Sequence, residues 1–114
     1  MNDKSNILDR LYSVIESHKI GSVETSYTAK LFSKGLPVIA EKVGEESIEI
    51  IVAALIENEK RLIEESADLL YHLLVLWAKK GIKPDDIWEE LCRREGTSGI
   101  EEKGNRIKDK RRQF

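Results

Sequence analysis

Residues 42–72 read KVGEESIEIIVAALIENEKRLIEESADLLYH, and this stretch decides the fold that the sequence predicts. Its apolar residues recur at steps of three and four, which is typical of amphipathic helices and not of strands. Asn58, at a polar break in this pattern, can adopt a left-handed conformation and turn the chain. We therefore expect two long helices, at about 37–57 and 59–80, to form an antiparallel hairpin.

The rest of the chain continues this all-α pattern. Shorter helices are expected at about 5–18, 26–34 and 84–95, where apolar stripes are bounded by glycine or proline. The predicted fold is a four- to five-helix bundle with the hairpin at its centre, in one domain over residues 1–96. Residues 97–114 have a net positive charge and interspersed glycines, so we expect a basic C-terminal tail there that is irregular or mobile.

Composition narrows the class of protein. The chain has 114 residues and a net charge of −2, which predicts no general attraction to nucleic acid. A single cysteine, Cys92, excludes a disulfide framework and a multi-cysteine zinc site, and it fits a reducing compartment. The longest nearly apolar run is too short to span a bilayer, and the first residues do not look like a secretion signal. We therefore expect a cytoplasmic protein with no membrane or nucleic-acid partner.

Two pairs of carboxylates lie in the predicted hairpin. Glu46 and Glu49 share one face of the first long helix, because residues three apart are neighbours on a helix surface. Glu65 and Asp68 repeat this spacing on the second long helix. In an antiparallel hairpin Glu46 lies level with Asp68. About 4.5 Å along the axis, Glu49 lies level with Glu65, so four carboxylates are expected to converge.

The apolar surroundings of these carboxylates favour a metal site. Ionised carboxylates among apolar residues repel one another and lose hydration, which a divalent cation compensates. Oxygen ligands select Mg²⁺, with Mn²⁺ as a substitute. The ordinary alternative is a solvated helix face, and a di-iron bundle is disfavoured because no glutamate has a histidine three residues later. His72 is either a support for Asp68 or a core residue, and we leave it out of the site.

The motifs Glu45-Glu46-x-x-Glu49 and Glu65-x-x-Asp68 together resemble those of the MazG-type all-α nucleotide pyrophosphohydrolases. Flanking segments make the sequence similar, over about residues 6–106, to the phosphoribosyl-ATP pyrophosphatase family of histidine biosynthesis. These segments read SYTAKL at 26–31, KVGEE at 42–46, ADLLYHL at 67–73 and GTSG at 96–99.

The resemblance implies a Mg²⁺-dependent hydrolase whose small-molecule substrate is phosphoribosyl-ATP. Cleavage between the α and β phosphates would yield phosphoribosyl-AMP and pyrophosphate, and residues 1–96 would form the pyrophosphohydrolase domain. The resemblance also implies a homodimer. The second long helix agrees with a homodimer, since it is apolar over more of its circumference than so small a chain can cover.

This activity gives roles to the carboxylates. The expected metal ligands are Glu46, Glu49, Glu65 and Asp68. Glu45 lies one turn before Glu49 on the same side of the helix. Either Glu45 or Glu49 can therefore orient or deprotonate the attacking water, and the sequence does not decide between them.

The phosphates of the substrate need cationic partners. Lys42 is the best placed, because it lies one turn before the first expected metal ligand on the same helix face. The resemblance places Lys30 and Lys34 near the substrate. Three polar residues that begin this shorter helix can donate hydrogen bonds to phosphate or ribose, or can cap and pack the helix. They are Ser26, Tyr27 and Thr28.

Two other functions stay open at this point. A pyrophosphohydrolase that removes unwanted (d)NTPs from the nucleotide pool would share the metal cluster and differ in its base pocket. A non-catalytic helical adaptor would instead use the basic tail for anionic partners.

Overall fold

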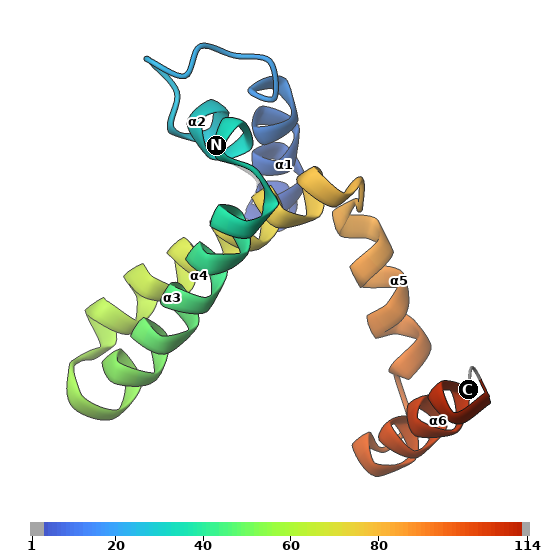
Figure 1. Cartoon of the computed structure of the whole chain (residues 1–114). Helices are drawn as coiled ribbons and strands as arrows, with labels where there is room; N and C mark the ends of the chain where they lie inside the picture. Colours follow the sequence, from blue (N-terminus) through green and yellow to red (C-terminus); the bar gives the residue numbers. More distant parts are fainter. Residues whose placement is uncertain (1–3, 113–114) are drawn as a thin grey trace. The chain divides into compact units, whose positions relative to one another are not determined.

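The computed structural model describes the backbone of residues 4–112 and the side chains of residues 4–107. The described backbone forms a 3₁₀ turn, Lys4–Asn6, and six α-helices, without a strand (Figure 1). This confirms the predicted all-α class. The helices are α1 (Ile7–Ser17), α2 (Tyr27–Lys34), α3 (Leu36–Ile56), α4 (Glu59–Lys80), α5 (Pro84–Arg94) and α6 (Gly99–Arg112).

Helices α3 and α4 form the antiparallel hairpin that the sequence predicts (Figure 1). The turn between them differs from the expectation at Asn58, whose backbone is extended with φ −138° and ψ 172°. Its side chain accepts a hydrogen bond of 3.0 Å from the N–H of Arg61, so Asn58 caps the start of α4. The prediction of a left-handed Asn58 is therefore wrong. The left-handed residue at this helix is Gly81, with φ 73°, which ends α4.

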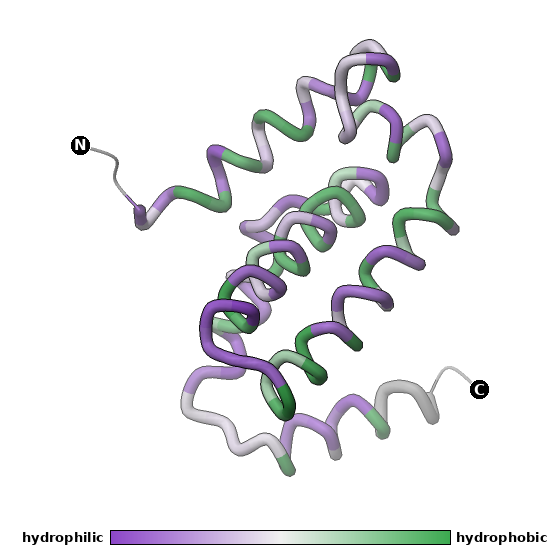
Figure 2. The backbone as a smooth tube through the Cα atoms, turned by 90° about the vertical axis from the view of Figure 1, so that its left-hand side faces the viewer, coloured by the Kyte–Doolittle hydropathy of each residue, from purple (hydrophilic) through white to green (hydrophobic). Residues whose placement is uncertain are grey.

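The hydrophobic core lies at the open end of the hairpin. Here α1 and α2 pack against the beginning of α3 and the second half of α4. Figure 2 shows hydrophobic and hydrophilic residues alternating along the helices, as one-sided burial requires. The Tyr12 hydroxyl also ties α1 to the carbonyl of Ile82 at 2.8 Å. The buried apolar residues of this cluster are Ile15, Leu31, Phe32, Ile39, Leu74, Val75 and Ala78.

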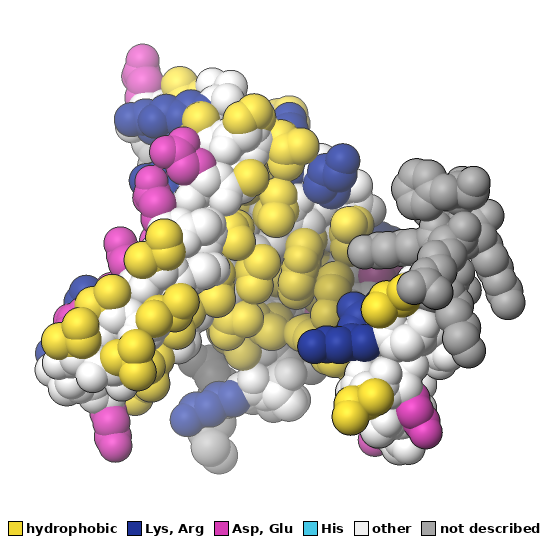
Figure 3. All heavy atoms as spheres, turned by 60° about the horizontal axis from the view of Figure 1, so that its bottom comes forward, with side chains coloured by type: hydrophobic (Ala, Val, Ile, Leu, Met, Phe, Trp, Pro, Cys, Tyr) yellow, Lys and Arg dark blue, Asp and Glu magenta, His cyan; other side chains and the backbone are white. Residues whose placement is uncertain are grey.

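The closed half of the hairpin leaves large apolar side chains exposed. On each helix they recur at steps of three, four or seven, so they form one stripe along it. Figure 3 shows hydrophobic side chains gathered over this part of the hairpin. We call this surface the hairpin stripe; its residues are Ile48, Ile51, Val52 and Leu55 of α3 and Ile63 and Leu70 of α4. Among the described residues, no helix is long and apolar enough to cross a membrane.

The chain divides into two compact units, residues 1–84 and residues 85–114. In the second unit, Arg93 of α5 donates a hydrogen bond of 2.5 Å to the buried Glu102 of α6. Glu102 also pairs at 3.6 Å with Arg106, one turn later. Such pairs stabilise a helix where the glycines and charges of the sequence predict irregular structure. The mobility of this tail and a domain boundary after residue 96 stay predictions.

Candidate metal centre and active site

Facing turns of α3 and α4 bring three carboxylates together. One ligand oxygen each from Glu46, Glu49 and Glu65 lies within 4.8 Å of the other two. The first two come from one face of α3 and the third from α4, which is the arrangement that an antiparallel hairpin imposes on this spacing. We call these three residues the carboxylate cluster.

Asp68, the fourth expected ligand, is not part of this group. Its side chain is exposed, although its negative charge is close enough to affect the pKa of Glu46. Its backbone carbonyl accepts a hydrogen bond of 2.9 Å from Nδ1 of His72. The hairpin thus brings together three of the four predicted ligands and leaves the carboxylate of Asp68 at the edge.

The carboxylate cluster contains buried oxygens that lack partners. The side chain of Glu65 is 6% exposed and that of Glu46 is 13% exposed. Oε2 of each is buried and has no hydrogen-bond partner among the described residues. A buried carboxylate oxygen without a partner is costly, and an oxygen-ligated cation satisfies it. The donor set and the unpartnered oxygens therefore fit Mg²⁺ or Mn²⁺.

The crowding of the carboxylates changes their proton affinities. Burial raises the pKa of Glu46, and hydrogen bonding with Glu65 and the charge of Asp68 raise it further. Hydrogen bonding with Glu49, followed by burial, raises the pKa of Glu65. Glu46 and Glu65 thus have a higher pKa than ordinary glutamates, and a cation that binds their ionised forms competes with protons for them.

Arg61 is a residue of this site that was not predicted from the sequence. Its guanidinium donates a hydrogen bond of 2.6 Å to Oε1 of Glu65 and also contacts Glu57 and Glu64. It therefore neutralises part of the charge of the carboxylate cluster. The spacing of four residues between Arg61 and Glu65 makes this pair possible on a helix, although Glu57 and Glu64 have a comparable spacing from Arg61.

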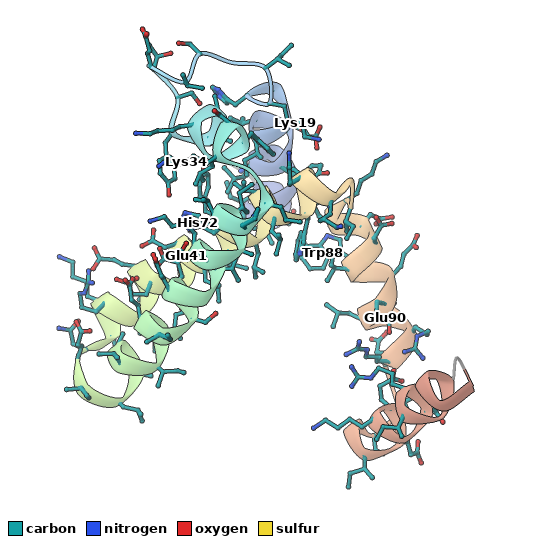
Figure 4. The ribbon with its side chains drawn as sticks, in the orientation of Figure 1. Lys19, Lys34, Glu41, His72, Trp88 and Glu90 are labelled. Carbon is teal, nitrogen blue, oxygen red and sulfur yellow. The ribbon has the colours of Figure 1, made fainter. Side chains whose placement is uncertain are left out.

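The structure separates the two candidate bases. Glu49 belongs to the carboxylate cluster, whereas the exposed Glu45 forms an ion pair of 3.5 Å with Lys42. The charge of Glu45 raises the pKa of Lys42, so this lysine stays positively charged. Lys42 thus lies one turn before the cluster on α3, as expected from the sequence. Figure 4 shows Glu41 and His72 in the same region of the hairpin.

The three polar residues that begin α2 differ in their contacts. The Ser26 side chain accepts a hydrogen bond of 3.1 Å from the N–H of Ala29 and caps the helix. Thr28 is buried and hydrogen-bonded to the hydroxyl of Tyr71. Both contacts correspond to the capping and packing alternative. Of the three, only Tyr27 contacts a neighbour of the cluster: its hydroxyl lies 2.8 Å from Nε2 of His72, and Nδ1 of His72 lies 3.7 Å from Oε1 of Glu46.

The two lysines of α2 are not joined to the cluster. Lys30 and Lys34 are exposed, and no hydrogen bond or ion pair within the described residues connects either of them to a cluster carboxylate. Their contact with a substrate stays a prediction.

The fold and the site together define a class of protein, all-α proteins whose helical hairpin carries a cluster of converging carboxylates. Within this class, the model of the phosphoribosyl-ATP pyrophosphohydrolase family matches residues 8–95. The chain belongs to this family.

Individual relatives agree with the family match. The chain is 56% identical to the phosphoribosyl-ATP pyrophosphatase of Paramagnetospirillum magneticum, over 95% of this chain and 99% of the relative. It is 53% identical to that of Azospirillum brasilense, over 88% and 90%, and 57% identical to that of Sulfurisphaera tokodaii, over 79% and 96%. These matches confirm the resemblance noted in the sequence and the enzyme class it implies, a hydrolase acting on a phosphoric anhydride.

Proposed function

We propose that this chain hydrolyses phosphoribosyl-ATP between its α and β phosphates, giving phosphoribosyl-AMP and pyrophosphate in histidine biosynthesis. The relatives bear the name of this activity. The observation that carries the proposal is the carboxylate cluster with two buried oxygens that lack partners. A triphosphate brings several negative charges, and its hydrolysis needs a site that can hold a compensating cation.

The residues of the cluster would hold Mg²⁺, for which Mn²⁺ is the expected substitute. Glu46, Glu49 and Glu65 are the ligands that the geometry supports, and Asp68 at the edge is a fourth. When bound, Mg²⁺ neutralises phosphate charge and stabilises the oxyanions that develop during hydrolysis. Glu49, or Glu45 one turn before it, orients the attacking water and accepts its proton.

Lysine side chains would receive the phosphates. Lys42 is held at 3.5 Å from Glu45, and its positive charge lies next to the turn that carries Glu46. Lys30 and Lys34, exposed on α2, are further candidates that a bound substrate would bring into contact. Lysine side chains that are already in position stabilise the leaving pyrophosphate, because the site does not have to rearrange as negative charge develops.

Substrate preference tests the proposed function. With Mg²⁺, kcat/KM for phosphoribosyl-ATP should exceed that for dATP or dGTP by at least about a hundredfold. An enzyme discriminates on this scale against a substrate that lacks polar groups with which its site forms hydrogen bonds. Pyrophosphate release can be measured with each substrate in parallel. A preference for the dNTPs would contradict the proposal and indicate an enzyme that clears the nucleotide pool.

We also propose that the chain forms a homodimer through the hairpin stripe. Its members are large, apolar and well exposed, with Leu55 79% and Ile48 64% exposed. Contiguous apolar surface of this kind is typical of interfaces between subunits. A second copy would cover it with a twofold-symmetric contact, since the same surface is present on both chains.

A lysine in the hairpin stripe should disrupt this dimer. The Leu55→Lys exchange places a charge in the proposed interface, and we expect sedimentation equilibrium to show an at least about tenfold weaker dimer. Ile20→Lys is the matched control, because Ile20 is 97% exposed and lies outside the stripe. Unchanged association of the Leu55→Lys protein, or an equal loss in the control, would contradict the assignment of this surface.

The single cysteine of the chain supports a proposal for the cellular location. Cys92 is a free, exposed thiol, which fits the reducing cytoplasm that the sequence predicts. We place the enzyme there, with a small-molecule substrate and without a nucleic-acid or membrane partner.

A further inference from the structure

The two carboxylate oxygens of Glu65 have different surroundings. Oε1 accepts a hydrogen bond of 2.6 Å from Nη2 of Arg61, which lies one turn earlier on α4. Oε2 is buried and has no hydrogen-bond partner among the described residues. The whole side chain is only 6% exposed, so bulk water does not surround it. One oxygen of this carboxylate is therefore occupied, and the other remains for a cation.

The direction of this hydrogen bond does not depend on the protonation of any carboxylate. An arginine side chain keeps its positive charge in proteins and has N–H donors but no acceptor. Arg61 therefore donates to Oε1 of Glu65 whether or not a neighbouring carboxylate carries a proton. The chemistry of the guanidinium alone determines which group donates and which accepts.

The guanidinium of Arg61 is itself held by several contacts. Its Nε donates to Glu57 at 3.2 Å, and its Nη1 donates to Glu64 at 3.4 Å. Its nitrogens thus contact three different carboxylates, although the side chain is 45% exposed. The backbone N–H of Arg61 donates to the Asn58 side chain at 3.0 Å, which fixes the first turn of α4. The rigid, planar guanidinium can therefore hold Glu65 in one orientation.

The number of available oxygens affects which cation a carboxylate site prefers. Ca²⁺ takes about six to eight oxygen ligands and can use both oxygens of one carboxylate. Mg²⁺ is smaller, keeps several waters and is usually bound by only one or two carboxylates. Because Arg61 occupies Oε1 of Glu65, the carboxylate cluster offers fewer oxygens to an ion. This arrangement favours the smaller cation.

We propose that Arg61 is a positioning residue that makes Glu65 a one-oxygen ligand and thereby favours Mg²⁺ and Mn²⁺ over Ca²⁺. The inference rests on the proposed function, since it concerns the cation that the carboxylate cluster would hold. In this role Arg61 touches neither the cation nor the substrate and acts through Glu65. Groups that hydrogen-bond a metal ligand typically change the metal affinity about ten- to 100-fold, which gives the scale of the expected effect.

Cation binding in the absence of substrate tests this role. The electron paramagnetic resonance signal of free Mn²⁺ gives the affinity for Mn²⁺, and displacement of bound Mn²⁺ gives the affinities for Mg²⁺ and Ca²⁺. Arg61→Met removes the donors and keeps an unbranched side chain on an exposed helix face. We expect the preference for Mg²⁺ over Ca²⁺ to fall at least about tenfold in this variant. The reason is that Ca²⁺ gains access to Oε1 of Glu65.

The ratio of the two affinities separates position from charge. Loss of the positive charge of Arg61 changes the attraction for both cations alike, because each carries two charges, so this effect cancels in the ratio. An unchanged ratio would overturn the inference, whether the two affinities rise or fall together. Lys60→Met is the matched control and should leave the ratio unchanged. Lys60 is exposed, and no ion pair within the described part of the chain joins it to the cluster.

A crystal structure of the unaltered chain with Mn²⁺ is a second test, and it needs no variant. One oxygen of Glu65 should contact the ion while the other still accepts from Arg61. Both oxygens on the ion, a released Arg61, or failure of the unaltered chain to bind Mn²⁺ would overturn the inference. A chain that binds Mn²⁺ with the expected preference but does not hydrolyse phosphoribosyl-ATP would instead refute the proposed function alone.

Discussion

Exchange of Glu49 for glutamine is expected to lower kcat for phosphoribosyl-ATP about a thousandfold, because a bound cation supplies several kcal/mol of transition-state stabilisation. Glu49 provides one of the three converging carboxylates, and a neutral amide is a poorer ligand for a hard cation. The side chain is exposed, so its replacement leaves no cavity in the core. Steady-state kinetics at saturating Mg²⁺ will measure the loss, and an unchanged circular dichroism spectrum will show that the fold is intact.

The matched control for this exchange is Glu41→Gln. Glu41 is exposed on the same helix and lies outside the carboxylate cluster, so turnover should stay within about twofold. Glu45→Gln identifies the base: if Glu45 accepts the proton of water, kcat falls while the Mg²⁺ concentration at half-maximal rate does not change. Turnover by Glu49→Gln at nearly the unaltered rate would be evidence against a catalytic cluster and for a non-catalytic helical adaptor.

The hairpin and most of its cluster could be predicted because they depend on local rules. Two long helices with periodic apolar residues and a short polar connection pack as antiparallel neighbours. This arrangement aligns α3 with α4 residue by residue. Glu46, Glu49 and Glu65 follow directly from that alignment.

Asp68 and Arg61 show the limit of that reasoning. Equal height along a hairpin does not determine the direction in which a side chain points, and Asp68 lies at the right level but is exposed. Arg61 reaches Glu65 through a long side chain with many rotamers, and spacing alone does not choose among its neighbours Glu57, Glu64 and Glu65.

Tertiary contacts account for the remaining differences between the structure and the predictions from sequence. His72 acquires Tyr27 as a partner only when α2 packs on the hairpin and brings the Tyr27 hydroxyl to its ring. The helix α6 is stabilised by Glu102, which pairs with Arg93 of α5 and with Arg106 one turn away. Neither set of contacts is visible in the hydropathy pattern of a single segment.

Mg²⁺ should raise the melting temperature of the protein, and the rise should be larger at higher pH. Burial raises the pKa of Glu46, and hydrogen bonding with Glu49 raises that of Glu65. A pKa that is higher in the folded than in the unfolded state means that folding is favoured by protonation. The metal-free protein therefore loses stability as pH rises through these raised values. Mg²⁺ binds the ionised carboxylates and restores the loss.

Thermal unfolding should be measured with and without Mg²⁺ at about pH 5 and at about pH 8, which lie above the ordinary pKa values of carboxyl and imidazole groups respectively. The comparison gives both the rise in melting temperature and its dependence on pH. At Mg²⁺ about 100 times Kd, binding adds about 2.7 kcal/mol, or roughly 10–20 °C for a domain of this size. Glu65→Gln should be more stable than the unaltered protein without metal at the higher pH, and it should lose most of the Mg²⁺ response. Glu64→Gln, an exchange of an exposed neighbour that also contacts Arg61, should keep the response.

The pH dependence separates binding at this cluster from binding elsewhere. Ordinary surface carboxylates have pKa values of about 4, so they are already mostly ionised at about pH 5 and fully ionised at about pH 8. Mg²⁺ bound to them would therefore stabilise the protein by similar amounts at the two pH values. A response that is equal at the two pH values, or equal in Glu65→Gln and the unaltered chain, would contradict a metal centre built on Glu46 and Glu65. A response that grows with pH and disappears with Glu65 requires carboxylates whose protons Mg²⁺ displaces.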